Sequence, residues 1–362
     1  MQAQALRNRQ LHNTSIEIVS FESDPNLLEE FIDFPWRLYH GDENWIPPRK
    51  DNLRYRLSNK HHFFDHGQAR HFIAYDKNRE ILGRVTANIN YRLIIEGEQI
   101  GHVGFFESID DYSVTEALLD SAINYLHEQG VKTIWGPINY ATLYEYRFVT
   151  KGFDKKTFFS DVYNPPYYPE FFQRYGFSKL RDYFTDTNED KAPVLKKYQR
   201  FRKRFLDMGY STRNVDLSNY DNELRLLYDL LFKCFSDNFA FTHFDYDEFV
   251  DLYKKYETLI EPKHLKFALN QDKKEIGFYL AFPDLSGQHK NAFLTKMVGV
   301  LPEYVHVGVG MALTHEMFED VIKVNYDYSI VPFRIEGNAS RKFGKGLCSG
   351  YKEYALFEYK LA

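Results

Sequence analysis

The 362-residue chain has 46 Lys and Arg against 51 Asp and Glu, which gives a formal net charge of -5. This balance supplies no basic field for a nucleic-acid backbone, so we expect no nucleic-acid partner. The hydrophobic fraction of 44% is typical of a globular protein, and the length is sufficient for two domains.

The cysteine count and the apolar pattern limit the cellular context. Two cysteines, Cys234 and Cys348, are too few for a disulfide framework. The N-terminal stretch lacks the apolar segment of a secretion signal, and nowhere do 18 apolar residues run together. These features predict a soluble cytoplasmic protein without a transmembrane segment.

The first half of the chain reads as alternating strands and helices. The spacing of Leu27, Leu28, Phe31 and Phe34 predicts an amphipathic helix, because apolar residues recur every three or four positions. In chain order we expect a strand (16–21), that helix, a second helix (48–59), a hairpin, a strand ending near Glu107, a helix (113–129), a strand (131–137), a short helix (167–175) and a closing strand pair.

The second half repeats this order at a fixed distance. "EILGRVTA" from Glu80 and "KEIGFYLA" from Lys274 are 194 positions apart, and three further segment pairs keep the same spacing. The corresponding elements are a strand (210–216), a helix with Leu224, Leu227, Leu231 and Phe235, a helix (245–257), a hairpin, a strand ending near Leu301, a helix (308–324), a strand (326–332), a short helix (338–345) and closing strands. The repeat predicts two copies of one architecture.

Antiparallel strands followed by a parallel crossover predict a mixed α+β sheet in each copy. We expect an N-terminal domain over residues 1–186, a linker helix over 187–208 and a C-terminal domain over 209–362. The basic run "KKYQRFRKRF" at 196–205 falls in this linker and is interpreted as a solvated helix face.

A glycine-rich turn marks the C-terminal copy. In "VGVLPEYVHVGVGMAL", Gly308 and Gly310 stand at the turn into the expected crossover helix, whose N-terminus presents unpaired N–H groups to an anion. Glycine keeps the approach to these groups open, so the turn is a candidate phosphate site. An ordinary tight turn is the alternative, because glycine enters any turn that needs positive φ.

This turn, together with "EGNASRKFGKG" after the next strand, resembles the GNAT superfamily of acyl-CoA N-acyltransferases. The family's fingerprint is Arg/Gln-x-x-Gly-x-Gly/Ala, which Gly308 and Gly310 match while Val305 stands at the Arg/Gln position. Asn338 matches an asparagine that members often carry, whereas Gly344, Lys345 and Gly346 occupy the region of the usual proton-donor tyrosine.

The front-half motifs "FPWRLYHGDENWIPPRKD", "GPINYATLYEYRFVTKGFD" and "YNPPYYPEFFQRYGF" are similar to a bacterial tandem-GNAT family of uncharacterised acetyltransferases. The resemblance covers most of the chain and implies two GNAT-like domains with acetyl-CoA or another acyl-CoA as donor. The implied donor-binding positions are Met297, Val298, Gly299, Val300, His306, Val307, Gly308, Val309, Gly310, Met311 and Asn338.

The N-terminal copy is expected to have lost its CoA site. At the offset of 194, Val114 and Glu116 stand opposite the two glycines. A branched side chain and a carboxylate would crowd and repel a pyrophosphate.

Glu303, His306 and Glu336 are candidate general bases in the C-terminal copy; Glu303 is read as a solvated loop carboxylate, so Glu336 is preferred, with Glu107 and Glu145 as the candidates in the N-terminal copy. Glu336 directly follows an expected strand, Glu107 ends one, and Glu145 lies in the insertion 139–165. This insertion is the main length difference between the copies, so it is expected either to roof an acceptor site between the domains or to be a purely structural cover.

A metal site is not expected. His61, His62, Asp65 and His66 lie close together, but no second cluster completes a tetrahedral ligand set.

These features predict an N-acyltransferase, most simply an acetyltransferase, in which an amine attacks an acyl-CoA directly. The acceptor is a small-molecule or lipid amine that no motif specifies. The alternatives are a transferase with a long-chain acyl or aminoacyl donor, and a non-catalytic CoA-binding scaffold or sensor.

Overall fold

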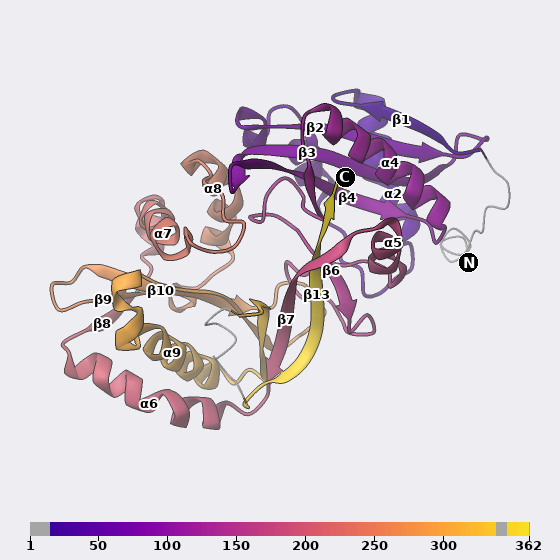
Figure 1. Cartoon of the computed structure of the whole chain (residues 1–362). Helices are drawn as coiled ribbons and strands as arrows, with labels where there is room; N and C mark the ends of the chain where they lie inside the picture. Colours follow the sequence, from indigo (N-terminus) through magenta and orange to yellow (C-terminus); the bar gives the residue numbers. More distant parts are fainter. Residues whose placement is uncertain (1–14, 338–345, 362) are drawn as a thin grey trace. The chain divides into compact units, whose positions relative to one another are not determined.

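The computed structural model describes residues 15–337 and 346–361 (Figure 1). The chain forms two compact units. Unit 1 comprises Met1–Asp182 together with Tyr354–Ala362, and unit 2 comprises Tyr183–Glu353. Strands β7 (Ser178–Asn188) and β13 (Ser349–Lys360) each contribute one part to each unit.

Unit 1 is built on a mixed sheet with antiparallel strands first. The strands, in sheet order, are β1 (Glu17–Phe21), β2 (Gly67–Tyr75), β3 (Ile81–Ile95), β4 (Glu98–Ser108), β5 (Thr133–Gly136) and the end of β13. Neighbours pair antiparallel except β4 and β5, which run parallel. The remaining elements are α2 (Pro25–Leu38), α3 (Lys50–Leu57), η1 (His62–Asp65), α4 (Tyr112–Glu128), β6 (Phe148–Lys151) and α5 (Tyr167–Tyr175).

Helix α4 is the crossover between the parallel strands of unit 1. Its inner face buries Val114, Leu118, Ala122 and Leu126, at the spacing that predicts an amphipathic helix. Burial of each Leu contributes about 1.5–3 kcal/mol. The helix packs so closely on β3 that a Cβ at Gly83 would lie 2.8 Å from the Leu118 side chain.

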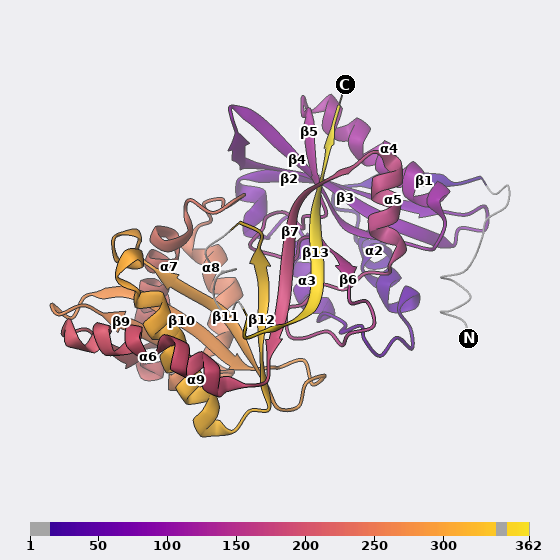
Figure 2. The ribbon, with the colours of Figure 1, turned by 60° about the horizontal axis from the view of Figure 1, so that its bottom comes forward.

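Unit 2 repeats this order. Its sheet runs from β7 through β12 (Tyr328–Ile335), β11 (Ala292–Val300), β10 (Glu275–Pro283) and β9 (Leu265–Leu269) to β8 (Ser211–Asn214), with β12 between β7 and β11 (Figure 2). Along this order, β11 and β12 run parallel and the other neighbouring strands pair antiparallel. The helices are α6 (Lys191–Asp207), η2 (Leu217–Asn219), α7 (Tyr220–Phe235), α8 (Tyr246–Tyr253), η3 (Lys254–Thr258), η4 (Pro262–His264), η5 (Pro302–Val307) and the crossover α9 (Val309–Val324).

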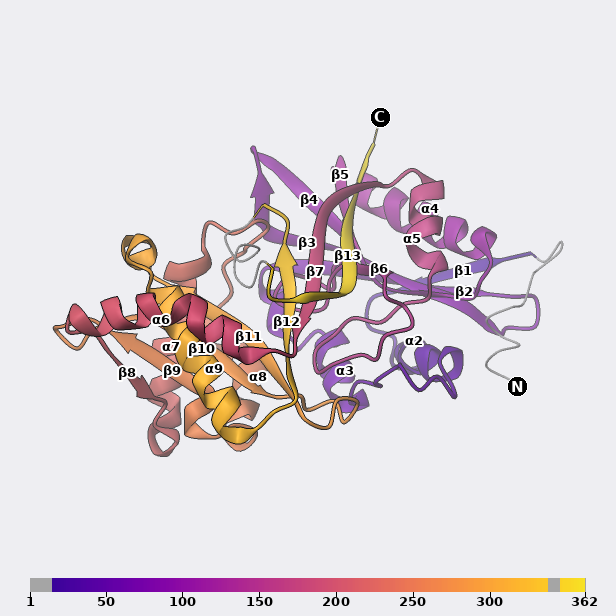
Figure 3. The same cartoon turned by 90° about the horizontal axis from the view of Figure 1, so that it is seen from below.

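Helices α6 and α9 lie side by side in unit 2 (Figure 3). Val194, Tyr198 and Phe205 of α6 join Val309 and Leu313 of α9 in one buried cluster. Helix α6 is therefore part of the core of unit 2.

The predicted mixed α+β class is confirmed in both units, and the predicted elements are present wherever the residues are described. The short helix expected at 338–345 lies outside the described residues. The compact units assign α6 to unit 2 and the last chain segment to unit 1, whereas the sequence placed α6 in a linker and the last segment in the second domain. Within residues 15–337 and 346–361, no helix combines the length and the apolar character that crossing a bilayer requires.

Candidate functional site

The two central strands of unit 2 separate part of the way along their length. β11 and β12 pair in parallel at three positions, from Ala292 with Tyr328 to Leu294 with Ile330. Beyond this point β11 continues to Val300 paired with β10 alone, and β12 continues paired with β7. In the described part of unit 2, residues 297–300 therefore have one strand edge without a strand partner.

The hydrogen-bond pattern shows which backbone groups face this gap. The Leu301 N–H donates to the Ile276 carbonyl at 3.0 Å. Because N–H directions alternate along an antiparallel ladder, Gly299 points toward β10, while Val298 and Val300 point their N–H and C=O groups into the gap. A Cβ at Gly299 would lie 2.5 Å from the Phe278 ring, so close packing explains that glycine.

The glycine turn lies at the end of this strand. Gly308 is the N-cap of α9 and adopts a left-handed conformation, with φ 87° and ψ 22°. Its carbonyl accepts from Met311 and Ala312, whereas the N–H groups of Val309 and Gly310 have no partner among residues 15–337 and 346–361. Unpaired N–H groups and the helix dipole make this end of α9 favourable for an anion.

Gly308 also has a packing role. A Cβ at this position would lie 2.7 Å from Cδ1 of Phe201, which belongs to α6. Both the positive φ and this contact require glycine. The presence of Gly308 is thus explained without a ligand, and the unpaired N–H groups of the next two residues are what point to an anion.

The other predicted donor-binding residues lie around this strand and turn. Met297 is half-buried and its sulfur accepts from the Tyr253 hydroxyl at 3.9 Å, while Val307 and Met311 pack against the core cluster. Val305 and His306 are exposed on η5. Asn338, Gly344 and Lys345 lie outside the described residues.

Unit 1 contains the same separation of strands, but there it is filled. β4 and β5 pair in parallel from Ile100 to His102 and then separate. The segment after β5 enters the gap: the Ile138 N–H donates to the Val103 carbonyl at 2.9 Å, and the Phe105 N–H donates to Asn139 Oδ1 at 2.7 Å.

The backbone N–H and C=O groups at the end of β4 in unit 1 are also hydrogen-bonded. The Ser108 N–H donates to the Tyr168 hydroxyl at 2.7 Å, and the Ser108 carbonyl accepts from the Tyr167 hydroxyl at 2.8 Å. Chain segments of unit 1 itself therefore occupy the edge that is unpaired in the described part of unit 2.

The turns that follow the two strands differ in length. Ile109 in unit 1 and Leu301 in unit 2 make the same ladder contact, donating to Leu82 and Ile276. The helix N-cap follows two residues later in unit 1, at Asp111, and seven residues later in unit 2, at Gly308. The additional residues form η5.

This correspondence corrects the alignment at a constant offset of 194. Gly308 stands opposite Asp111 and Gly310 opposite Ser113, because these residues hold the same places in the two helices. Val114 is instead a fully buried core residue. The Asp111 carboxylate accepts from the Ser113 N–H at 2.9 Å, so an anion of the chain itself already occupies this helix end.

Glu107 lies in a buried polar cluster of unit 1. Its carboxylate accepts from the Tyr39 hydroxyl and, at 2.9 Å, from the Tyr168 hydroxyl, and the Arg84 guanidinium is 3.8 Å away. Burial, reinforced by the Glu107 charge, raises the pKa of both tyrosines well above the ordinary value, so they remain protonated donors. These contacts tie α2, β3, β4 and α5 together.

Glu145 forms an ion pair with Arg56. Desolvation raises the pKa of Glu145, but the Arg56 charge and hydrogen bonds outweigh it and hold the pKa below the ordinary value. This direction is opposite to what a general base requires. Nearby Tyr140 is buried and stacks on Phe63 with ring centroids 4.1 Å apart, so this part of the insertion packs into unit 1.

Glu336 directly follows β12 and is exposed. It is the predicted base that belongs to unit 2, the unit with the unpaired strand edge.

The histidine-rich segment makes hydrogen bonds within unit 1. His61 accepts from the Phe63 N–H at 3.2 Å through Nδ1, and its Nε2 lies 3.2 Å from the Tyr144 hydroxyl. Across residues 15–337 and 346–361, no group of three or more His, Cys, Asp or Glu side chains is arranged to hold a metal ion.

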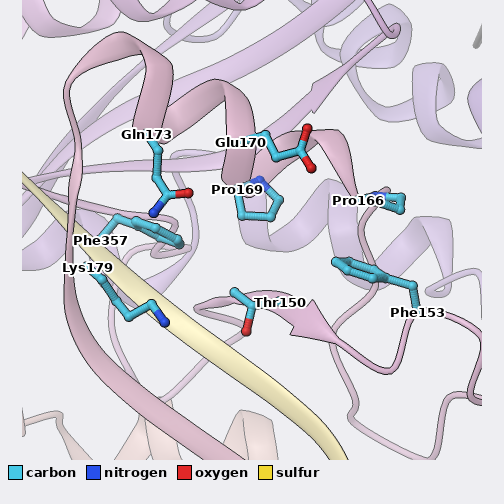
Figure 4. A pocket seen from close by; sticks show the side chains of 8 residues that line it. All are labelled: Thr150, Phe153, Pro166, Pro169, Glu170, Gln173, Lys179 and Phe357. Atoms are coloured by element: carbon cyan, nitrogen blue, oxygen red, sulfur yellow. The ribbon is translucent and has the colours of Figure 1, made fainter.

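A shallow pocket of about 170 Å³ lies in unit 1 beside α5 (Figure 4). Its lining residues are Thr150, Phe153, Pro166, Pro169, Glu170, Gln173, Lys179 and Phe357. None of them belongs to the polar groups described above, and the pocket adds no chemistry to the candidate site.

Sequence reasoning missed the residues that distinguish the units. Nothing in the sequence sets Asn139, Tyr39 or Tyr168 apart from other polar and aromatic residues. Phe201 lies within the basic run of α6, which was interpreted from its charge alone. The turns before α4 and α9 differ in length, and this difference could have distinguished the two units from sequence. An alignment at a constant offset of 194 does not show it.

No protein-family model matches the chain. Two curated proteins are similar in sequence. A bacterial ceramide synthase from Caulobacter vibrioides is 28% identical over 280 residues, covering 76% of this chain and 71% of the relative. Protein YghO from Escherichia coli is 28% identical over 268 residues, covering 72% of this chain and 67% of the relative.

Solved structures share the architecture. A tandem GNAT protein from the clavulanic acid biosynthesis pathway has a TM-score of 0.56 at 11% identity, covering 96% of this chain and 98% of that one. A solved chain with a GCN5-related glucosamine N-acetyltransferase region, from a fungal multi-domain β-N-acetylglucosaminidase, has a TM-score of 0.59 at 14% identity, covering 96% of this chain and 38% of that one. The chain has the tandem GNAT fold.

Proposed function

We propose that this protein is an N-acyltransferase whose unit 2 binds an acyl-CoA thioester and transfers the acyl group to an amine. The observation that carries the proposal is the unpaired edge at Val298 and Val300, which leads into the unpaired N–H groups of Val309 and Gly310. An extended pantetheine arm has amides that can pair with such an edge, and a pyrophosphate suits such a helix end.

The same edge can support the chemistry. The amine nitrogen attacks the thioester carbonyl carbon, the C–N bond forms, the C–S bond breaks, and the CoA thiolate leaves. An N–H of Val298 or Val300 directed at the carbonyl oxygen would stabilise the negative charge that develops there. The amine must also lose a proton, and we assign this role to Glu336 because it lies in unit 2 directly after β12.

The likeness to a bacterial ceramide synthase suggests the substrate class. A ceramide is the amide of a fatty acid and a long-chain amino alcohol. We therefore propose a lipid amine as acceptor and a long-chain acyl thioester as donor, in preference to the acetyl group. In the sequence, Gly344, Lys345 and Gly346 occupy the region of the usual GNAT proton-donor tyrosine, which favours a second candidate, a CoA-binding protein without transferase activity.

Thermal stability and thiol release test these proposals together. At a palmitoyl-CoA concentration of 100 Kd, we expect stabilisation of about 2.7 kcal/mol, equivalent to a Tm increase of roughly 5–10 °C. Adding a long-chain amino alcohol should release free thiol, and acetyl-CoA or glucosamine should give a slower reaction. Binding without thiol release over a panel of amines would support the CoA-binding alternative.

A matched pair of variants locates the site. Gly310→Glu places a carboxylate where the pyrophosphate is proposed to lie, so we expect donor binding to fall at least 100-fold, as loss of more than one charge-assisted contact implies. Ser113→Glu changes the corresponding position in unit 1 and should leave binding unchanged. Full activity in a folded Gly310→Glu variant would contradict the assignment to unit 2.

A further inference from the structure

Helix α6 carries an unusual run of like charge. Residues 191–206 include seven Lys or Arg and no Asp or Glu, in a chain whose net charge is -5. Arg200 has a cation at each of its four helical neighbours: Lys196, Lys197, Lys203 and Arg204. Like charges three or four residues apart destabilise a helix.

The apolar contacts of α6 leave these cations on its exposed side. Val194, Tyr198 and Phe205 are buried against α9, which fixes the rotation of the helix. At about 100° per residue, Arg200 and its four cationic neighbours fall within an arc of about 120°. Lys196, Arg200, Lys203 and Arg204 are exposed, and none of these four has a carboxylate partner in the described part of the chain.

One edge of this cationic side lies beside the beginning of α9. Phe201, at the border between the apolar and cationic sides, packs against Gly308. The Arg200 guanidinium lies over the Phe201 ring, 4.6 Å from its centroid. Arg202, on the other side of the helix, forms an ion pair with Glu316 farther along α9.

We infer that the cationic side of α6, centred on Arg200, binds the phosphate groups at the nucleotide end of the acyl-CoA. The inference rests on the proposed function. Val305 carries no charge at the turn before α9, so the cations of α6 would supply the positive charge there. A bound polyanion would also relieve the repulsion among these five cations. Arginine suits this role because its guanidinium pairs with phosphate in two-point geometry.

A membrane surface is the competing partner for a basic helix. Membrane-surface helices insert an apolar face into the lipid, but the apolar side of α6 is buried in the core of unit 2. Leu206 is the exposed large aliphatic residue on the described α6. The charge and burial pattern therefore favours a soluble polyanion.

The test measures CoA and dephospho-CoA binding to the full chain by calorimetry. Arg200→Ala should weaken CoA binding about tenfold, in line with the loss of one charge-assisted contact, and Arg200→Glu should weaken it further. Dephospho-CoA, which lacks the 3′-phosphate, should bind more weakly than CoA to the unmodified protein. Arg225→Ala is the matched control, because Arg225 is also exposed and lies over an aromatic ring, 4.2 Å from the Tyr246 centroid.

The free protein gives an independent measurement. Arg200→Glu replaces four like-charge neighbours by four opposite-charge pairs, so the Tm without ligand should rise while CoA affinity falls. If Arg200 has only a structural role, the Tm and the CoA affinity of Arg200→Glu should both decrease, and that result would overturn the inference.

The remaining outcomes separate the two proposals. If Gly310→Glu abolishes CoA binding but both Arg200 variants bind like the unmodified protein, the inference is wrong and the proposed function stands. If the unmodified protein does not bind CoA, both are wrong. If the Arg200 variants lose binding to phosphatidylglycerol vesicles but retain CoA affinity, α6 is a membrane contact and the inference is wrong.

Discussion

Both units let two parallel strands separate after three paired residues, but the two gaps have different surroundings. In unit 1, the segment after β5 supplies Asn139 to the Phe105 N–H, and Tyr168 satisfies Ser108. In unit 2, the Val298 and Val300 amides have no strand partner on that side among the described residues. The same fold can therefore provide a closed structural element or an edge available to an extended ligand.

The N-termini of the two crossover helices, α4 and α9, also differ in how well they can accept an anion. The Asp111 carboxylate caps α4 in unit 1, whereas Gly308 begins α9 with no side-chain cap. The Asp111 carboxylate already accepts the Ser113 N–H, and its negative charge repels a second anion at this helix end. Strand edge and helix end thus both favour unit 2 as the donor-binding unit.

Burial lowers the pKa of His264 in unit 2 to about 4, but unit 1 buries two histidines with larger shifts and should be the more sensitive to acid. Burial lowers the pKa of His71 and of His102 to about 3 each, with Arg84 and Arg70 adding to the effect at His71. The unfolded chain takes up these protons near pH 6.5 and the folded unit does not, so stability falls as pH decreases from about 6.5 toward 3. By pH 4.5 we expect a loss of roughly 3 kcal/mol per histidine.

Urea unfolding at pH 7 and pH 4.5 measures this effect. His71→Gln should reduce the pH dependence of the free energy of unfolding, and His127→Gln, at an exposed position, should not. An unchanged pH dependence in His71→Gln would show that this histidine does not carry the acid sensitivity.

The strand edge of unit 2 can be tested by removing one N–H. Val300→Pro deletes an amide that faces the gap and leaves the ladder with β10 intact, so thiol release should fall about 100-fold with little loss of stability. Gly299→Pro removes an N–H directed at β10 and should lower stability instead. Unchanged thiol release in Val300→Pro would exclude this amide from the reaction.

The corresponding change in unit 1 should affect stability alone. Asn139→Ala removes the acceptor of the Phe105 N–H and should cost about 1–3 kcal/mol, the penalty of an unsatisfied buried donor. Denaturant unfolding measures the loss, and thiol release per folded molecule should not change. A large change in turnover at unaltered stability would mean that the filled gap takes part in the chemistry.

Much of each unit could be predicted from local patterns. Apolar spacing of three and four residues indicated α2 and α7, the helices expected at 113–129 and 308–324 are close to the observed α4 and α9, and the polar turns placed both hairpins. The position of Gly308 and Gly310 at the start of a crossover helix was also correct. The expectation that the basic run is a solvated linker missed that its helix packs on α9 through Phe201.

The sequence by itself determined the order of the elements and the existence of two copies, because helix and strand periodicity arises from neighbours along the chain. Only the tertiary structure decided which strand edge is left unpaired, that the end of β13 pairs with β5 from Phe357 to Lys360, and that Asn139 fills one gap. These are contacts between residues far apart in sequence, and their energies depend on packing geometry that no local pattern encodes.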